Sequence, residues 1–451
     1  MVLYGIEEKA KKFRSIFKIA LPLMIQGLVF QLQALTDKAF LGNLDTRYIS
    51  AAGAAQMPYS ATADSLVAIN IGLVIIVSRF FGAGEKEKIS SYVKSTVFYS
   101  SLLAIGICLI WQCKTGVILG LFQIDQEIIG YSIQYVKIVS VYLLFLGADS
   151  SLQAMLQGSG ETKPIMYAGI LKVGLDILLS WILIFGKFGF PALYVSGAAI
   201  GTLIANLVSF LYILCYCMIL HRKKYHLNIF SKAWVQVKPY KDTIRLGLPV
   251  GMEYLLWNAS NLILIRFING FSYRDMAIYT LTFGFQCIVY MIFESTSKAT
   301  MTLIGQSIGA GRRERVNGYF YTAILINLII VGTAAVCFSF FPERLLGIFS
   351  NDSQVIRYGV PYLMWMGIIM FPQSMNVICG NAIRAHGDTK WMLFSQIFGS
   401  VLVISVSWIL VEKVHMNMLA IYVTLFADEA IRGGVNFIYY RRKYGRAVLC
   451  R

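Results

Sequence analysis

Leu21–Asn43 reads LPLMIQGLVFQLQALTDKAFLGN, and this stretch decides the class of fold. A helix needs about 20 mainly apolar residues to cross a bilayer, and this stretch supplies them. It also carries two charged side chains, Asp37 and Lys38, near its end. An ionisable side chain at bilayer depth costs about 2.5–3.5 kcal/mol on insertion scales, so it is usually paired, exposed to water or functional. Two interpretations stay open: the pair marks the membrane interface, with Lys38 reaching outward, or it has a function.

The composition of the whole chain indicates an all-α integral membrane protein that crosses the bilayer many times. Of its 451 residues, 57% are apolar and 14% are charged, whereas soluble domains have roughly 45–50% apolar and about 25% charged residues. The basic N-terminus precedes an apolar run that no small-residue cleavage site follows. We interpret this run as an uncleaved first span and not as a signal peptide.

The formal net charge of +17 does not indicate nucleic-acid binding, because the basic residues cluster in alternate loops. These clusters lie at the N-terminus and at 79–94, 222–245, 312–315 and 441–451. Such alternation is typical of membrane proteins whose basic loops face the cytoplasm. It predicts a multi-pass protein of the cell membrane with an even number of spans and both termini in the cytoplasm.

Apolar runs separated by polar or glycine-containing turns predict twelve transmembrane helices. The predicted spans are 16–36, 53–80, 92–113, 130–156, 165–186, 195–220, 243–268, 277–307, 318–341, 356–383, 391–411 and 417–440. We expect six of them in an N-lobe (1–220) and six in a C-lobe (243–440). A basic cytoplasmic linker (221–242) would join the lobes, and a basic cytoplasmic tail (441–451) would follow them.

The two halves of the chain repeat at one constant offset in the sequence, which is the offset from Pro22 to Pro249. Further matches at this offset are Gly82–Gly84 with Gly309–Gly311 and Gly160–Lys163 with Gly387–Lys390. Because each repeat holds an even number of spans, both have the same orientation, and a pseudo-two-fold axis should run along the membrane normal. Such parallel repeats favour a transporter, although a duplicated membrane scaffold stays open.

Some ionisable residues within the predicted spans are spaced as ion pairs. Lys172 and Asp176 are four positions apart, as are Glu294 and Lys298, so each pair shares one helix face. Pairing is the least costly way to hold charge in hydrocarbon, which favours a structural role.

Glu253 differs, because no basic residue lies three or four positions away from it. Tyr254 and Trp257 could offer aromatic faces to an organic cation near this carboxylate. Alternatively, they are packing or interface residues.

Other chemistries find no support in the sequence. The four histidines fall in loops or at span ends, the eight cysteines are scattered, and no phosphate-binding loop ending in Lys-Ser/Thr occurs. We therefore expect no enzymatic activity, no metal and no cofactor. Transport energy would come from an ion gradient or from the gradient of the substrate.

The sequence motifs resemble those of the multidrug and toxic compound extrusion (MATE) family over nearly the whole chain. The resemblance rests on the Leu-Pro start of each half, Asp37 followed by Phe40-Leu41-Gly42, the Gly-Ala-Gly loops, GSGETKP at 158–164 and IRAHGDTK at 383–390. It implies twelve helices in two six-helix lobes. It also implies export of amphipathic, often cationic compounds in exchange for H⁺ or Na⁺.

The resemblance also implies which residues act. It assigns ion coupling to Asp37, Asp176 and Thr202 in the N-lobe and to Glu253 in the C-lobe. Gln373 aligns where some members carry an Asp, and we expect it to contribute to substrate binding together with Glu253, Tyr254 and Trp257.

Lys172 departs from the family pattern, which usually has an Asn at this position. Its ammonium group would repel Na⁺ from a site that needs oxygen ligands, so H⁺ is favoured as the coupling ion. Two possibilities remain for Lys172. Either it is a counter-ion released when Asp37 is protonated, or coupling has moved to Glu253.

We therefore expect a monomer in the lipid bilayer that exports small amphipathic, cationic organic compounds by antiport with H⁺, or less favourably with Na⁺. No nucleic acid is expected as a partner. A flippase for lipid-linked saccharides stays open, favoured by the basic residues within spans (Lys38, Lys172, Arg266, Lys298 and Arg432). A non-transporting membrane scaffold also stays open.

Overall fold

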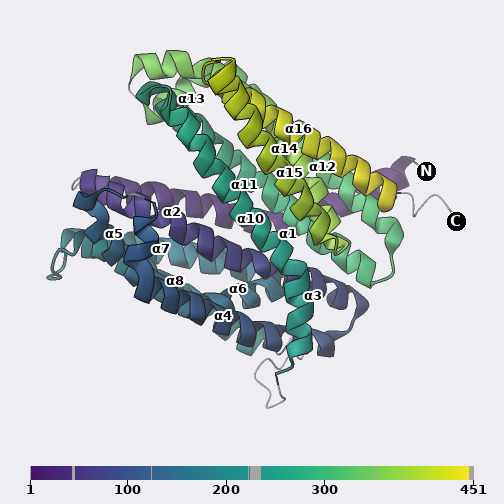
Figure 1. Cartoon of the computed structure of the whole chain (residues 1–451). Helices are drawn as coiled ribbons and strands as arrows, with labels where there is room; N and C mark the ends of the chain where they lie inside the picture. The colour runs from purple at the N-terminus through teal and green to yellow at the C-terminus, as the bar shows by residue number, and fades with distance from the viewer. Residues whose placement is uncertain are drawn as a thin grey trace. The chain divides into compact units, whose positions relative to one another are not determined.

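The computed structural model describes residues 2–42, 46–122, 124–221, 223, 235–350 and 352–445. Within these ranges the chain forms helices and no strand (Figure 1). Each of the twelve predicted spans coincides with a long helix or with two helices in succession. The all-α membrane fold predicted from the sequence is therefore confirmed.

The first half of the chain contains helices α1 to α8, in the order of the predicted spans. They are α1 (Val2–Gly42), α2 (Thr46–Ile69), α3 (Ile71–Ala83), α4 (Lys86–Gly120), α5 (Gln126–Val139), α6 (Leu143–Ser159), α7 (Lys163–Phe185) and α8 (Tyr194–Tyr216), which a π-turn at Cys217–His221 extends. A 3-10 turn at Ser140–Tyr142 joins α5 to α6.

The second half follows the same plan with one additional short helix, α13. Its helices are α10 (Val237–Asn269), α11 (Tyr273–Gly309), α12 (Arg313–Phe340), α13 (Pro342–Phe349), α14 (Ser353–Ala385), α15 (Thr389–Trp408) and α16 (Leu419–Lys443). A π-turn at Ile409–Lys413 extends α15.

Ten helical segments in the described part of the chain are long and apolar enough to cross a membrane. The two remaining predicted spans lie on α10 and α16, which have 33 and 25 residues. Both are long enough to cross a bilayer, for which about 20 residues suffice. Polar and charged side chains, among them Glu253, Asp428 and Arg432, lower the hydropathy of these two helices. These two helices fall short in hydropathy and not in length.

The helices pack as two compact units, each with its own core. The N-unit is Ile25–Gly251, and the C-unit combines Met1–Met24 with Met252–Arg451. The chain therefore passes from one unit to the other inside α1 and again, at the corresponding position of the second half, inside α10. Each passage follows a proline within the helix, Pro22 in α1 and Pro249 in α10. Proline removes one backbone hydrogen bond from a helix, so these passages lie where the helices are weakened.

Glycine allows α10 to approach α2 very closely within the N-unit. A Cβ atom on Gly247 would lie 1.7 Å from the carbonyl oxygen of Ile69, and one on Gly251 would lie 3.0 Å from the carbonyl oxygen of Ser65. Small residues four positions apart permit this kind of contact between membrane helices. No larger residue fits at Gly247 unless a backbone moves.

The repeat predicted from the sequence reappears in backbone geometry. Gly160 and Gly387, which occupy equivalent positions in the two halves, have φ angles of 80° and 79°. Gly84 and Gly311, a second equivalent pair, have φ angles of 77° and 71°. A side chain at a positive φ clashes with the backbone, which explains why glycine occupies the same two turns in both halves.

A buried hydrogen bond repeats in the same way, with its residue types exchanged. In the N-unit, Ser100 donates from Oγ to Oδ1 of Asn70 at 3.2 Å. In the C-unit, Asn327 donates from Nδ2 to Oγ of Ser297 at 3.1 Å. Position 70 corresponds to 297 and position 100 to 327. Asn70 also separates α2 from α3, where the sequence predicted one continuous span, and it donates to Ser150 at 2.6 Å.

Candidate functional site

In the N-unit, the structure brings three of the predicted ion-coupling residues together. Asp176 on α7 is fully buried, and Gln33 on α1 donates from Nε2 to its Oδ2 at 2.6 Å. Thr202 on α8 and Lys172, one turn earlier on α7, lie close enough to act on the same carboxylate. Sequence reasoning missed Gln33. The side chain of Asp37 lies outside the described residues.

Lys172 also acts on a second buried carboxylate, which the sequence did not single out. Asp149 on α6 is 4% exposed and accepts hydrogen bonds from Tyr142 at 2.5 Å and Gln153 at 3.0 Å. Lys172 acts electrostatically on Asp149, and its Nζ lies 4.8 Å from the ring centroid of Phe30. Among the described residues of this unit, one ammonium group thus serves two buried carboxylates, and this set of three has room for one additional positive charge.

In the C-unit, Glu253 on α10 is 5% exposed and forms an ion pair with Arg384 on α14. The pair joins Oε2 of Glu253 to Nη2 of Arg384, which is 131 residues away in the sequence. The sequence shows no base three or four positions from Glu253. Its partner lies on another helix and escaped notice, because helical spacing detects partners only within one helix. Arg384 belongs to the IRAHGDTK motif, which carried the family resemblance but had not suggested a partner for Glu253.

The two aromatic residues predicted beside Glu253 have different surroundings. Tyr254 is partly buried, and Glu294, Lys298 and Arg384 act on it electrostatically. Trp257 is 47% exposed. Tyr254 therefore belongs to the charged interior of the C-unit, whereas Trp257 offers a ring face at its surface.

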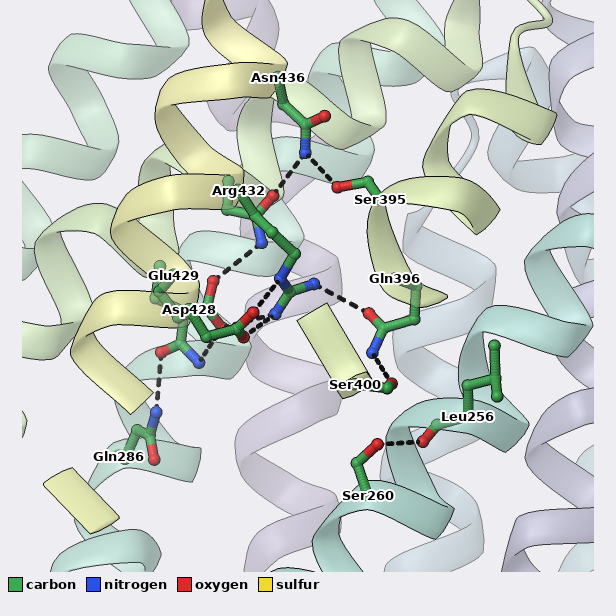
Figure 2. Close-up of polar contacts among 12 residues, drawn as sticks. Leu256, Ser260, Gln286, Ser395, Gln396, Ser400, Asp428, Glu429, Arg432 and Asn436 are labelled. Atoms are coloured by element: carbon green, nitrogen blue, oxygen red, sulfur yellow. Dashed lines mark hydrogen bonds and ion pairs between the residues drawn. The ribbon is translucent and has the colours of Figure 1, made fainter. Parts of the chain in front are cut away.

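The predicted pair on α11 forms, with Nζ of Lys298 3.1 Å from Oε1 of Glu294. A second pair on α16 joins Arg432 to Asp428 through two hydrogen bonds, from Nε at 2.8 Å and from Nη2 at 2.5 Å (Figure 2). Arg432 also donates from Nη1 to Gln396 on α15 at 2.9 Å. The fork of the guanidinium group is therefore occupied by a carboxylate and an amide oxygen.

Gln373, predicted to contribute to substrate binding, lies in a chain of polar side chains that ends at Glu429. Gln286 on α11 donates to Oε1 of Gln373 at 2.9 Å, and Gln373 donates to Oε1 of Glu429 at 3.4 Å. Asn376 on α14 donates to Oε2 of Glu429 at 2.8 Å. Figure 2 labels Gln286 and Glu429 together with Arg432, which lies 3.6 Å from Glu429. Glu429 was not among the predicted site residues.

These contacts define the charge balance of the interior of the C-unit, as far as the described residues go. The acids are Glu253, Glu294, Asp428 and Glu429, and the bases in contact with them are Lys298, Arg384 and Arg432. Four carboxylates thus face three basic side chains. The site can take up a proton or a small positive charge without a further counter-ion. Among the described residues, no group of three or more His, Cys, Asp and Glu side chains could hold a metal ion.

Two helical bundles of repeated sequence, with ionisable side chains buried inside their spans, define a class of proteins: the membrane transporters built from repeats. A family model described as MatE matches residues 22–182 and again residues 249–409. The chain belongs to the MatE family. The two matches begin at Pro22 and Pro249, the offset that also separates the repeated motifs, which confirms the internal repeat and the resemblance seen in the sequence.

Known proteins resemble this chain along nearly its whole length. It is 25% identical to the probable multidrug resistance protein NorM of Thermotoga maritima over 438 residues, which cover 96% of this chain and 93% of that protein. Among solved structures it is similar to an outward-facing multidrug resistance MATE family transporter, with a TM-score of 0.88, 20% identity and 96% of both chains covered.

A third relative is a MOP superfamily transporter from Pyrococcus furiosus, with a TM-score of 0.87 and 20% identity over 96% of both chains. That protein is described as having a binding pocket of reverse polarity, which suggests a different function for it. At 20% sequence identity, the similarity to these two solved structures shows that the fold is shared.

Proposed function

We propose that this chain is a secondary active transporter that exports amphipathic, cationic organic compounds in exchange for H⁺. The observation that carries the proposal is that, among the described residues, buried carboxylates outnumber the bases acting on them in each unit. A carboxylate that binds either a proton or an organic cation makes the two ligands compete. Such competition couples their movements, because each ligand changes the affinity for the other by the same factor. The name of the Thermotoga maritima relative supports multidrug export.

Lys172 supports H⁺ over Na⁺ as the coupling ion. Its ammonium group acts on both Asp149 and Asp176, where Na⁺ would need free oxygen ligands. In the proposed cycle, Asp37 or Glu253 takes a proton from outside and releases the organic cation. Protonation thereby shifts the equilibrium between the outward-facing and inward-facing states of the transporter.

The substrate would contact Glu253, Tyr254, Trp257 and Gln373 in the C-unit. We further propose a monomer in the cell membrane with both termini in the cytoplasm. The clustering of basic residues in alternate loops supports this orientation.

Efflux of a fluorescent organic cation from reconstituted vesicles tests the proposal. The proton gradient and the Na⁺ gradient are applied in turn to wild type, Asp37→Asn and Glu253→Gln. Glu343→Gln, an exposed acid on α13, is the matched control. Proton-driven efflux that one variant loses and the control keeps assigns the coupling acid to that unit. Efflux driven by Na⁺ alone would overturn the argument from Lys172.

A flippase for lipid-linked saccharides is the second candidate, because four basic side chains lie inside the helical bundles: Lys172, Lys298, Arg384 and Arg432. These groups could attract an anionic pyrophosphate. Transport of a labelled lipid-linked saccharide, without transport of the organic cation, would establish this function instead. If neither substrate is transported, the remaining candidate is a membrane scaffold without transport activity.

A further inference from the structure

Glu429 is the least neutralised carboxylate in the interior of the C-unit. Glu253 pairs with Arg384, Glu294 pairs with Lys298, and Asp428 holds two of the donors of Arg432. Glu429 is left with a contact of 3.6 Å to the same guanidinium group. Its side chain is nevertheless only 12% exposed. Among these four acids, Glu429 therefore has the longest ion-pair contact to a base.

The amides around Glu429 form a chain of hydrogen bonds with one direction. Gln286 donates to Gln373, and Gln373 donates to Glu429, so both bonds point toward the charged carboxylate. At the start of this chain, Oε1 of Gln286 is buried and has no hydrogen-bond partner in the described part of the protein. Gln286 is 6% exposed, so water does not readily satisfy this oxygen.

A protonated Glu429 would need an acceptor where it now faces the donor of Gln373. The amide of Gln373 can turn over, because its oxygen and nitrogen occupy equivalent positions. Its oxygen then accepts from Glu429, and its nitrogen donates to Oε1 of Gln286 once that amide has also turned. Before the reversal, Oε1 of Gln286 has no partner among the described residues, and after it Nε2 of Gln286 takes that place. The chain thus accommodates both protonation states with the same number of hydrogen bonds.

We propose that Glu429, in place of Glu253, which Arg384 neutralises, is the proton-binding carboxylate of the C-unit and that Gln373 and Gln286 are positioning residues that reverse with it. The proton comes from water on one side of the membrane and returns to water on the other side. No other bond forms or breaks. Protonation of Glu429 removes its negative charge, so Asp428 is then the one charged carboxylate on this helix that pairs with Arg432, whose Nη1 still donates to Gln396. The inference rests on the proposed proton-coupled transport.

In the described part of the chain, groups from four helices bear on the charge of Glu429. Arg432 and Asp428 lie on its own helix, α16, and Tyr290 approaches from α11. From α10, Glu253 acts electrostatically on Arg432. From α14 come the neutral amides of Gln373 and Asn376. Proton uptake at Glu429 therefore depends mainly on Arg432 and on the two amides.

The test combines transport with a spectroscopic readout. A gradient of one pH unit drives about tenfold accumulation of a substrate exchanged for one proton. We expect Glu429→Gln to lose this accumulation, whereas Glu343→Gln, the exposed control on α13, keeps it. In pH-difference infrared spectra of the purified protein, we expect a protonated-carboxyl band in wild type and Glu343→Gln and its loss in Glu429→Gln. Size-exclusion profiles establish that each variant is folded.

Gln373→Leu gives an independent arm in case Glu429→Gln does not fold. Without the hydrogen bond from Gln373, the charged form of Glu429 is less well stabilised. The protonated-carboxyl band should therefore appear at a pH higher by up to about one unit, which is a tenfold change in proton concentration. An unchanged band in both variants would overturn the inference, as would wild-type accumulation in Glu429→Gln. If wild type shows no proton-driven transport at all, the proposed function fails instead.

Discussion

The ion pair between Glu253 and Arg384 allows a sharp prediction about stability. Glu253 is 5% exposed and the side chain of Arg384 is 15% exposed, so water screens the pair poorly. Oε1 of Glu253 already lacks a partner among the described residues. In Arg384→Met the carboxylate would lose its one strong contact and stay buried. Removal of one member of a buried pair costs about 3–5 kcal/mol, and we expect a loss in this range.

Removal of both charges should cost much less than removal of one. Glu253→Gln/Arg384→Met leaves two neutral side chains of similar size, and such replacements are often neutral. Equilibrium unfolding of the purified protein in mixed micelles with increasing dodecyl sulfate measures four free energies of unfolding: those of wild type, Glu253→Gln, Arg384→Met and the double variant. The double-mutant cycle then yields the coupling between the residues. We expect the double variant to recover most of the loss.

An exposed pair serves as the control. Lys88 and Glu85 are 2.8 Å apart, with side chains that are 59% and 41% exposed. Lys88→Met should cost less than about 1 kcal/mol, because water and salt screen exposed pairs. The reasoning is refuted if Arg384→Met costs no more than this control. It is also refuted if the double variant is as unstable as the single one.

Three further predictions concern two glycines and a pair outside the spans. Gly247→Ala should prevent folding, as judged by expression and size exclusion, because its Cβ would overlap a carbonyl oxygen of α2. Its control is Gly53→Ala, where nothing lies within 4 Å of the added Cβ. We expect Gly53→Ala to stabilise the protein by about 0.5–1 kcal/mol. Gly387→Ala, at a positive φ, should cost about 1–2 kcal/mol in the same unfolding assay. Asp388→Asn should cost about 1 kcal/mol at neutral pH, because Asp388 accepts a hydrogen bond from Lys443 at 2.7 Å.

The prediction for Asp388 includes its pH dependence. Burial raises the pKa of this carboxyl, but the hydrogen bonds from Lys443 and two tyrosines outweigh it and hold the pKa below its usual value. The stability from Asp388 is therefore present above the unfolded-state pKa of about 3.9 and is lost as the pH falls through the lower folded-state pKa. A cost of Asp388→Asn that persists unchanged in acid would contradict this account. Normal folding of Gly247→Ala would contradict the close helix contact.

Sequence patterns predicted the helices because a membrane-spanning helix is specified by the apolar residues of its own segment. An apolar run of sufficient length specifies a span whatever its neighbours are, and α10 and α16 were found despite their charges. The break at Asn70 was not predicted. Asn70 is itself neither proline nor glycine, and its side chain is held by Ser150 and Ser100, which follow far along the chain.

The candidate site was less accessible, because its contacts join different helices. Helical spacing correctly predicted the pair of Glu294 with Lys298, and the same rule applied to Asp428 and Arg432 would have found the second pair on one helix. Spacing could not reveal Arg384 as the partner of Glu253. That contact depends on how α10 and α14 pack, which no local pattern specifies.

The exchange of helix segments near Pro22 and Pro249 has a consequence for the origin of the protein. Each unit is completed by the first helical segment of the other half, as in a domain-swapped dimer. A single ancestral half would then have been stable only as a pair, and fusion of two genes would have made an existing partnership permanent. Two halves expressed as separate chains should accordingly reassemble with each other, while neither should fold alone.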